Sequence, residues 1–422
     1  MPRQYFGTDG VRGVVGEFIT PELVERLGKA SALWCGSECR VFVGRDTRGS
    51  GPELEEAFAR GVASAGGHAV LAGVVPTPAV ALLRLDLGVV ITASHNPPEY
   101  NGVKFFDRNG RKLSDAHEEQ IEALLDANTP RGGTIAHVDV AADSYLDHIL
   151  ERFGTDLSGM RIAVDCANGA YSGLAPRAFE QLGAEVHAIA NEPDGNNINV
   201  RCGATDLRAL QGLVRGANCD IGIAFDGDGD RMLAVDAQGE VANGDEIVAI
   251  LAFHLNVDLV AVTSMSNLGL HKLLSEHGIR VLTTDVGDRY VLEALYREGG
   301  ILGAEQSGHI ICLRDHVTGD GLAAALLLCG ALEGHPLHTV RRAMIRYPQV
   351  TKNLPRVDRG PLSNLLVEQI EALNADLGAE ARVLVRPSGT EPLVRILTEA
   401  PTLAEAEDLC ATVAALVTKE LG

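Results

Sequence analysis

A short loop at residues 92–98, "TASHNPP", carries side chains suited to group transfer. The run Val89–Ile91 before it is apolar and β-branched, which predicts a buried strand, and the two prolines hold the following chain extended. Ser94 and His95 therefore lie at a strand tip, where α/β proteins usually place their chemistry. Because adjacent side chains rarely meet, a Ser94–His95 dyad is not expected. A loop that caps its own backbone is the alternative.

An alternating acidic run follows a second predicted strand. In "FDGDGDR", glycines separate Asp226, Asp228 and Asp230 and let the chain curl until the three carboxylates face one point. Such hard oxygen ligands favour Mg²⁺. Arg231 and Ala237 stand where an EF-hand needs Gly and Glu, which excludes that motif. An acidic surface turn and a phosphatase with an aspartyl nucleophile remain open.

A candidate anion site lies near the C-terminus in "RPSGTEP", Arg386 to Pro392. It offers a guanidinium, two hydroxyls and backbone N–H groups in a turn opened by Gly389, with Arg395 close by. The sequence contains no Walker motif, which argues against a P-loop nucleotide hydrolase. A plain hairpin turn is the alternative.

Further polar groups follow other predicted strands. In "EQSGH", the oxygens of Glu305 and Ser307 suit neutral hydroxyl groups such as those of a sugar, and His309 suits proton relay or phosphate binding. Lys104 and Arg12 add cations near candidate tips. A polar hairpin tip and solvated surface charge are the corresponding alternatives.

Taken together, these groups predict phosphoryl transfer through Ser94. A phosphoserine would carry about −1.5 to −2 charges. Mg²⁺ held by the three aspartates would neutralise that charge and polarise the phosphoryl group. With sugar and phosphate contacts on other loops, this combination is typical of a phosphosugar mutase.

Composition limits the other possibilities. The chain has 422 residues, 46% of them hydrophobic, which predicts two to four domains. A net charge of -21 argues against nucleic acid and anionic membranes as partners. The eight cysteines lack zinc-site spacing and are expected to be reduced and mostly buried, and with no signal peptide recognised we expect a cytoplasmic protein.

Strands and helices alternate through most of the chain, which predicts α/β layers. Three similar units each contain an apolar strand, a polar loop and a returning strand, and "ANTPRGGT" (Ala127–Thr134) forms a break. The last stretch, with a helix, a strand pair and a terminal helix, predicts a smaller α+β domain. We expect four domains around a central cleft, at residues 1–145, 146–243, 244–345 and 346–422.

The sequence resembles the α-D-phosphohexomutase superfamily over essentially its whole length, and within it the bacterial phosphoglucosamine mutases. The resemblance rests on ordered motifs: "YFGTDGVRG", "GRDTRGSG", "TASHNPPEYNGVKFF", "CANGA", "NNINVRCG", "FDGDGDR", "DVGDRYVLE", "EQSGH", "TGDG" and "RPSGTEPLVRI".

The resemblance implies a role for each candidate residue. Ser94 would carry the phosphate and, with Asp226, Asp228 and Asp230, would bind Mg²⁺, while Arg12, Lys104, Arg231 and His309 would assist transfer or proton movement. The implied substrate contacts are His95, Gly287, Asp288, Glu305, Ser307, Arg386, Ser388, Gly389, Thr390 and Arg395.

The resemblance also implies a reaction. Glucosamine 6-phosphate and glucosamine 1-phosphate would interconvert through a 1,6-bisphosphate, which also acts as activator, and the product would feed UDP-N-acetylglucosamine synthesis. The enzyme would be a monomer or a homodimer.

Four residues bear on the choice of sugar. Gln306 favours glucosamine, whereas Tyr100 resembles the loop of less selective hexose mutases, and Gly49 and Ala304 depart from the usual pattern. The alternatives are a phosphoglucomutase or phosphomannomutase, a Mg²⁺-dependent sugar phosphatase that uses Asp226, and a phosphosugar-binding protein without turnover.

Overall fold

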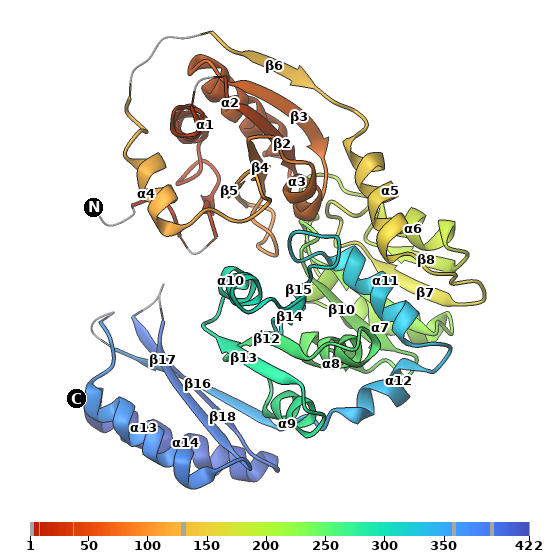
Figure 1. The fold of residues 1–422 in the computed structure, drawn as a ribbon, viewed down its shortest axis with the longest axis vertical. Helices are drawn as coiled ribbons and strands as arrows, with labels where there is room; N and C mark the ends of the chain where they lie inside the picture. Colours follow the sequence, from red (N-terminus) through yellow and green to blue (C-terminus); the bar gives the residue numbers. More distant parts are fainter. Residues whose placement is uncertain are drawn as a thin grey trace.

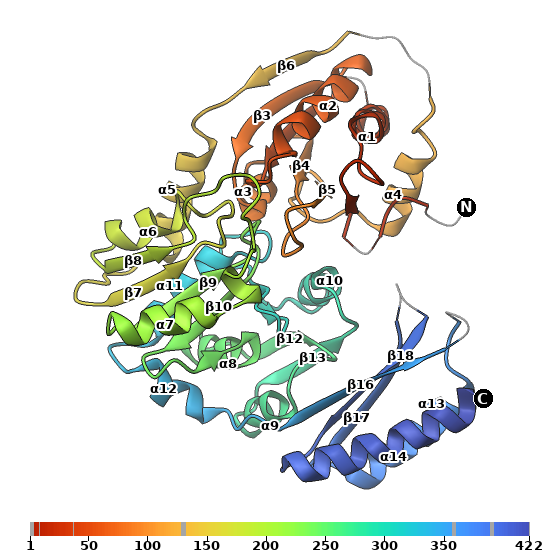
Figure 2. The same ribbon diagram turned by 180° about the vertical axis from the view of Figure 1, so that it is seen from behind.

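Four separate β-sheets organise the chain, and each sheet with its helices forms one unit (Figure 1). The computed structural model describes residues 4–7, 9–36, 38–127, 132–356, 360–388 and 392–421. The units follow one another along an arc, from the first unit at the top of Figure 1 to the fourth at the lower left. Figure 2 shows the same arrangement from behind, with the fourth unit beside the third.

The first unit has a six-stranded sheet in the order β1-β5-β4-β2-β3-β6. Helix α1 begins with Thr20 as N-cap, whose hydroxyl accepts a hydrogen bond from the backbone of Leu23. The elements are β1 (Val11–Val14), α1 (Pro21–Cys35), β2 (Arg40–Arg45), α2 (Gly51–Ser64), β3 (His68–Val74), α3 (Thr77–Leu83), β4 (Leu87–Ile91), β5 (Tyr100–Phe106), α4 (Asp115–Glu122) and β6 (Thr134–His137).

The second unit has a five-stranded sheet in the order β11-β10-β9-β7-β8. Its elements are α5 (Ala141–Phe153), β7 (Arg161–Asp165), α6 (Ala175–Gln181), β8 (Glu185–Ile189), the 3₁₀ turn η1 (Gly203–Thr205), α7 (Arg208–Gly216), β9 (Ile221–Phe225), β10 (Met232–Asp236) and β11 (Val241–Ala242).

The third unit has a four-stranded sheet in the order β13-β12-β14-β15. Its first helix starts with a capping box, in which Asn243 and Glu246 each bond the other's backbone N–H. The elements are α8 (Gly244–His254), β12 (Leu259–Thr263), α9 (Leu268–Glu276), β13 (Arg280–Thr284), α10 (Asp288–Glu298), β14 (Leu302–Ala304), β15 (Ile310–Cys312), α11 (Gly321–Ala331), α12 (Leu337–Val340) and the 3₁₀ turn η2 (Arg341–Ala343).

The first three sheets repeat one strand arrangement. Each sheet has three parallel strands, in the orders β3-β2-β4, β8-β7-β9 and β13-β12-β14. One antiparallel strand, β5, β10 or β15, extends each set. The loops β4–β5, β9–β10 and β14–β15 contain "TASHNPPE", "DGDGDR" and "EQSGH". Three copies of one unit therefore present their polar loops at equivalent tips, as the sequence predicted.

The fourth unit is an antiparallel α+β sandwich with the strand order β16-β18-β17. Its elements are β16 (Gln349–Pro355), α13 (Asn364–Leu377), β17 (Arg382–Pro387), β18 (Leu393–Glu399) and α14 (Leu403–Leu421).

The hydrophobic clusters divide the molecule differently from the sheets. One cluster of buried residues runs from Phe42 and Val90 of the first unit through the second unit to the third, and it includes the apolar helix α11. The fourth unit has a cluster of its own between its sheet and its helices α13 and α14. The first three units therefore contribute to one continuous cluster, beside which the first unit keeps a second cluster of its own, and the fourth unit contributes to neither.

The structure corrects three expectations. Strand β6 follows the predicted break with all four residues exposed, and β16 adds a third strand to the predicted C-terminal pair. Both lack the apolar pattern that indicates a strand. Cys35 and Cys39, expected to be reduced, form a disulfide, because the turn after α1 brings their Cα atoms to 5.9 Å. The other six cysteines are free and buried, as expected.

Within the described residues, no helix is long and apolar enough to cross a membrane.

Candidate active site

The Ser94 loop leaves a fully buried strand and turns sharply. All residues of β4 are buried, and Ser94 itself has a φ of 51°, in the left-handed region that non-glycine residues rarely adopt. Its backbone N–H donates to the hydroxyl of Thr92 at 2.9 Å. This conformation is stored strain at the tip of a buried strand, and such strain persists only where neighbouring groups hold it in place.

Arg48 makes several of the contacts that stabilise this strained loop, a role that its sequence pattern does not indicate. Its guanidinium is fully buried, pairs with Asp46 at 2.9 Å and donates to the carbonyl oxygens of Ser94 and Asn96, both at 2.8 Å. It also donates to the carbonyls of Pro97 and Tyr100. The available signal was its place in "GRDTRGSG", but nothing in that motif indicates which loop it contacts.

The second unit meets this loop through a close backbone approach. Asn199 donates from its side-chain amide to the carbonyls of Ser94 and Asn96, at 2.9 and 3.0 Å. A Cβ atom on Gly227 would lie 2.8 Å from the Ser94 carbonyl oxygen, so this position requires glycine. The acidic loop can therefore lie directly against the serine loop.

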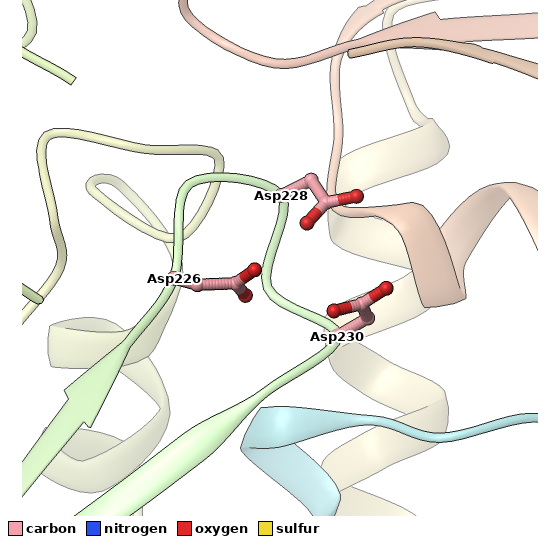
Figure 3. Close-up of side chains that lie close together, drawn as sticks. All are labelled: Asp226, Asp228 and Asp230. Atoms are coloured by element: carbon pink, nitrogen blue, oxygen red, sulfur yellow. The ribbon is translucent and has the colours of Figure 1, made fainter. Parts of the chain in front are cut away.

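Three aspartates converge at this contact. Asp226, Asp228 and Asp230 are buried, and one oxygen of each lies within 4.8 Å of the others. Figure 3 shows their carboxyl groups turned toward the same space beside the β9–β10 loop. Gly229, with a φ of 80°, provides the turn between the last two. The Ser94 hydroxyl donates to Asp226 at 2.7 Å, which joins the serine to the cluster.

The carboxylates have unequal electrostatic environments. Burial and the charges of Asp228 and Asp230 raise the pKa of Asp226 well above its usual value. For Asp230, burial acts in the same direction, but Lys104 and His309 outweigh it and lower its pKa. The cluster thus contains mutual repulsion that a cation would relieve.

The cluster fits a magnesium ion. One buried oxygen of Asp228 and one of Asp230 have no hydrogen-bond partner among the described residues. Uncompensated buried carboxylate oxygens are costly, and oxygen donors are the ligands that Mg²⁺ prefers. Their carboxylates, with Asp226, are the donors that would hold the ion.

Two more residues of the first unit, Lys104 and Thr77, contact the acidic loop. The ammonium of Lys104 lies 2.8 Å from Asp228 and 3.3 Å from Asp230 and is 3% exposed. The hydroxyl of Thr77 donates to Asp228 at 2.6 Å. Burial opposes the charge of Lys104, but the surrounding aspartates outweigh it and raise its pKa well above the usual value. Lys104 thus offsets part of the negative charge of the aspartate cluster.

The structure corrects the reasoning about Ser94 and His95. Their side chains do meet, with Oγ 3.3 Å from Nδ1, because the left-handed turn at Ser94 brings the neighbours together. Burial and the charge of Arg231 lower the pKa of His95 to about 4, so its imidazole is neutral. Arg12, on β1, is exposed and close enough to add to this effect.

Arg231 and His309 complete the group from the second and third units. Arg231 lies 3.8 Å from Asp230, and His309 lies between Asp230, at 3.7 Å, and Asp288, at 3.4 Å. Burial opposes the charge of His309, but the two aspartates outweigh it and raise its pKa. The acidic loop is thus contacted by cations from all of the first three units.

The predicted sugar contacts lie together in the third unit. The backbone N–H of Gly287 donates to Glu305 at 3.1 Å, and the hydroxyl of Ser307 lies 3.5 Å from the same carboxylate. Asp288 begins α10 next to Gly287. These residues therefore form one polar surface beside His309.

The fourth unit places two arginines opposite each other. Arg386 on β17 and Arg395 on β18 are directly paired across the antiparallel strands. Burial and the charge of Arg395 lower the pKa of Arg386, while Asp285 of the third unit acts in the opposite direction. Paired like charges are destabilising unless an anion joins them.

These arginines line a cavity of about 170 Å³ at the junction with the third unit, together with Met265, Thr351, Asn353 and Leu384. Ser388 is buried beside this strand pair, and the predicted contacts Gly389 and Thr390 lie outside the described residues.

The sequence matches all four domains of one protein family. The matches are to phosphoglucomutase/phosphomannomutase alpha/beta/alpha domain I over residues 3–132, domain II over 143–239, domain III over 243–347 and the C-terminal domain over 348–416.

Curated relatives and solved structures match over nearly the full length. A phosphoglucosamine mutase of Moorella thermoacetica is 47% identical over 96% of this chain and 97% of its own, and one of Symbiobacterium thermophilum is 44% identical over 100% of both. The structure of a phosphoglucomutase/phosphomannomutase family protein from Burkholderia thailandensis covers 99% of this chain and 98% of its own, with a TM-score of 0.85 and 26% identity.

Proposed function

Since the chain belongs to the phosphoglucomutase/phosphomannomutase family and is a phosphohexomutase of the isomerase class, we propose that it interconverts glucosamine 6-phosphate and glucosamine 1-phosphate. The observation that carries the proposal is the 2.7 Å hydrogen bond from the Ser94 hydroxyl to Asp226, inside a cluster of three carboxylates. It joins a nucleophile of the first unit to a candidate metal site of the second.

Ser94 carries the transferable phosphoryl group in this proposal. The P–Oγ bond of phosphoserine breaks as a sugar hydroxyl oxygen bonds to phosphorus, and the hydroxyl proton leaves to a base while Oγ gains a proton. The resulting 1,6-bisphosphate reorients in the site so that its other phosphoryl group faces Ser94, and it then returns that group to Ser94. Each cycle therefore regenerates the phosphoserine and isomerises the sugar phosphate.

Asp226, Asp228 and Asp230 would hold Mg²⁺ together with the Ser94 phosphate. The bound ion would supply charge neutralisation for the transferring phosphoryl group. The protein's own contribution is to arrange oxygen donors and to keep Ser94 within hydrogen-bond distance of them.

Cationic side chains around the cluster stabilise the transferring group. Lys104, in contact with Asp228 and Asp230, supplies positive charge to the site, and Lys104 and His309 are both placed to move a proton during transfer. Arg231 and Arg12 add positive charge from the loop end and from β1. His309, between two carboxylates, assists proton movement.

Substrate binding uses mainly the third and fourth units. Glu305 and Ser307 accept or donate to sugar hydroxyls, with Gly287 and Asp288 beside them, and His95 contributes from the Ser94 loop of the first unit. The remote phosphate is held by Arg386, Ser388, Gly389, Thr390 and Arg395. The opposed Arg386–Arg395 pair supports this role, because an anion removes its repulsion.

The names of the relatives support glucosamine as the sugar, since those reported above are phosphoglucosamine mutases. Gln306 contributes to substrate binding indirectly, by positioning the Glu305 loop. Its amide donates to Asp245 at 3.1 Å and to Gln349 at 3.0 Å, which ties the Glu305 loop to the start of the fourth unit.

Three further expectations belong to the same proposal. The domain boundaries lie at residues 145, 243 and 345, and the active enzyme is a monomer or a homodimer that needs a hexose or hexosamine 1,6-bisphosphate as activator. A cytoplasmic location is supported by the six free, buried cysteines, whereas the Cys35–Cys39 disulfide is uncommon in a reducing compartment.

A phosphosugar panel combined with intact-protein mass spectrometry tests the proposal. The enzyme, with Mg²⁺ and a catalytic amount of 1,6-bisphosphate, is given glucosamine, glucose and mannose 6-phosphates in turn. We expect fastest isomerisation with glucosamine and a mass increase of one phosphate that Ser94→Ala abolishes. Faster turnover of glucose or mannose would contradict the sugar assignment, and net phosphate release with an active Ser94→Ala variant would favour the phosphatase.

A further inference from the structure

Two charged residues outside the predicted site, Asp9 and Lys112, close a ring of ion pairs that passes through it. Three carboxylates alternate with three basic side chains around the ring, and the first, second and third units all contribute. In order, the members are Asp9, Lys104, Asp230, His309, Asp288 and Lys112, which returns to Asp9.

The shortest pairs in the ring are those of Lys112. Its ammonium lies 2.6 Å from Asp9 and 2.6 Å from Asp288, whereas Lys104 lies 3.2 Å from Asp9 and His309 lies 3.4 Å from Asp288. Lys112 therefore holds together two carboxylates, each of which also contacts a residue of the proposed catalytic group.

These ion pairs are largely shielded from water, so the loss of one partner should be costly. The side chain of Lys112 is 12% exposed, and those of Asp9 and Asp288 are 21% and 18% exposed. Burial opposes the charge of Lys112, but Asp288 and Asp9 outweigh it and raise its pKa above the usual value. Without this cation, the two shielded carboxylates would face one basic group fewer, and a lost partner of a buried charge is costly.

The position of Lys112 also links two units. It follows strand β5 of the first unit, whereas Asp288 is the first residue of α10 in the third. Two more contacts connect the first and third units nearby. Arg289 pairs with Asp115 at 2.6 Å, and the Arg111 guanidinium lies 3.7 Å from the centre of the Tyr296 ring. The α10 start is thus held against the first unit independently of Lys112, so its loss should not separate the units.

We propose that Lys112 is a positioning residue for phosphoryl transfer, which keeps Asp288 against His309 and Asp9 against Lys104. This inference rests on the proposed function, because it assigns Lys112 an effect on His309 and Lys104 during transfer. Lys112 itself contacts neither the aspartate cluster nor Ser94 among the contacts of the described residues.

The first test is Lys112→Met, which keeps the length of the side chain and removes its charge. We expect kcat to fall about 10- to 100-fold, the usual cost of losing a partner that orients a catalytic group. KM for the phosphosugar should stay within about 3-fold, since Glu305, Ser307 and the arginine pair are untouched and Asp288 keeps its own charge, and Lys112→Arg should recover most of the lost kcat. Lys352→Met, at an exposed position of β16, is the matched control.

A double-mutant cycle separates positioning from general destabilisation. If Lys112 acts through Asp288 and Asp9, then Lys112→Met should lower kcat by less than about 3-fold in a background that carries both Asp288→Asn and Asp9→Asn, because contacting partners are non-additive. Multiplying effects, or a Lys112→Met kcat within about 3-fold of the wild type, would overturn the proposal. Lys112→Gln enters the same cycle if the thermal melt shows that Lys112→Met is not folded.

The cycle is measured on whichever phosphosugar the wild-type enzyme isomerises fastest. A preference for another sugar would then contradict the glucosamine assignment while the cycle still decides the role of Lys112. Conversely, glucosamine turnover with multiplying effects would overturn only the role of Lys112.

Discussion

Two junctions in the molecule differ in the kind of contact that forms them: the one between the first and second units and the one between the third and fourth. The first is buried: the units share one hydrophobic cluster, and Ser94, Thr77 and Lys104 reach directly into the acidic loop. The second is polar: Asn267 exchanges hydrogen bonds with the backbone of Tyr347, Arg382 donates to the backbone carbonyl of Ser266, and Gln306 donates to the side-chain oxygen of Gln349.

This difference separates two tasks. Groups that act on the phosphoryl group must be aligned closely, which a packed core and buried ion pairs achieve before substrate arrives. In the proposed reaction, groups that hold the far end of the sugar must accept two opposed orientations of a bisphosphate, which a polar junction without a shared core permits. The comparison predicts kcat effects at the first junction and KM effects at the second.

The largest effect is expected for Ser94→Ala. Removal of the transferring oxygen should lower kcat by at least about 10³-fold. The fold should survive, because the hydroxyl makes a single short hydrogen bond, to Asp226. Turnover in a coupled assay and a thermal melt would check both statements. A variant that keeps more than a tenth of the activity would contradict the assignment of phosphoryl transfer to Ser94 and to the junction of the first and second units.

Removal of Mg²⁺ should have the next largest effect. Chelation is expected to stop turnover, and added Mg²⁺ should raise the melting temperature, because an ion among Asp226, Asp228 and Asp230 relieves their repulsion only in the folded state. At about 100 times its dissociation constant, the ion adds about 2.7 kcal/mol to the free energy of unfolding. Differential scanning fluorimetry with Asp228→Asn as control would test this, since that variant should lose the shift.

Arg386→Met should act on the other junction. Loss of a charged hydrogen bond to phosphate costs about 1.5–3 kcal/mol, so KM should rise about 10- to 100-fold while kcat changes less. Steady-state kinetics would measure the split, with Arg26→Met on the exposed face of the first unit as control. A fall in kcat with an unchanged KM would mean that the fourth unit belongs to the transfer machinery.

The smallest effect is expected for Gln306→Met, which removes the link between the Glu305 loop and Gln349. KM should rise about 3-fold, in keeping with the loss of neutral hydrogen bonds. The ratio of glucosamine to glucose turnover should hardly change, because the amide is bonded to Asp245 and Gln349. A reversed sugar preference would instead place this side chain against the substrate.

Local sequence was sufficient for the repeated units and their polar loops. Buried strands such as β4 and β9 are short apolar runs that end at breakers, so Ser94 and Asp226 could be placed at strand tips. The prediction that these tips converge followed from assembling complementary chemistry. The structure confirms the direct contact of Ser94 with Asp226.

Interactions that depend on distant partners were not predictable in the same way. Arg48 looks like any loop arginine until the fold places four carbonyls of the Ser94 loop around it. Lys112 reads as a surface charge, since its partners Asp9 and Asp288 are both far away in the chain. The contact of Ser94 with His95 required a backbone angle that sequence does not reveal.

The separate hydrophobic cluster of the fourth unit has a consequence for thermal denaturation. Because Leu366, Val394 and Val413 pack only within that unit's own cluster, its unfolding leaves the shared core of the other three units intact. A unit that small buries little apolar area per residue. Calorimetry should therefore record two transitions, the earlier one from the C-terminal unit, and proteolysis near that temperature should release a stable fragment that keeps Ser94 and its aspartates but has lost the paired arginines.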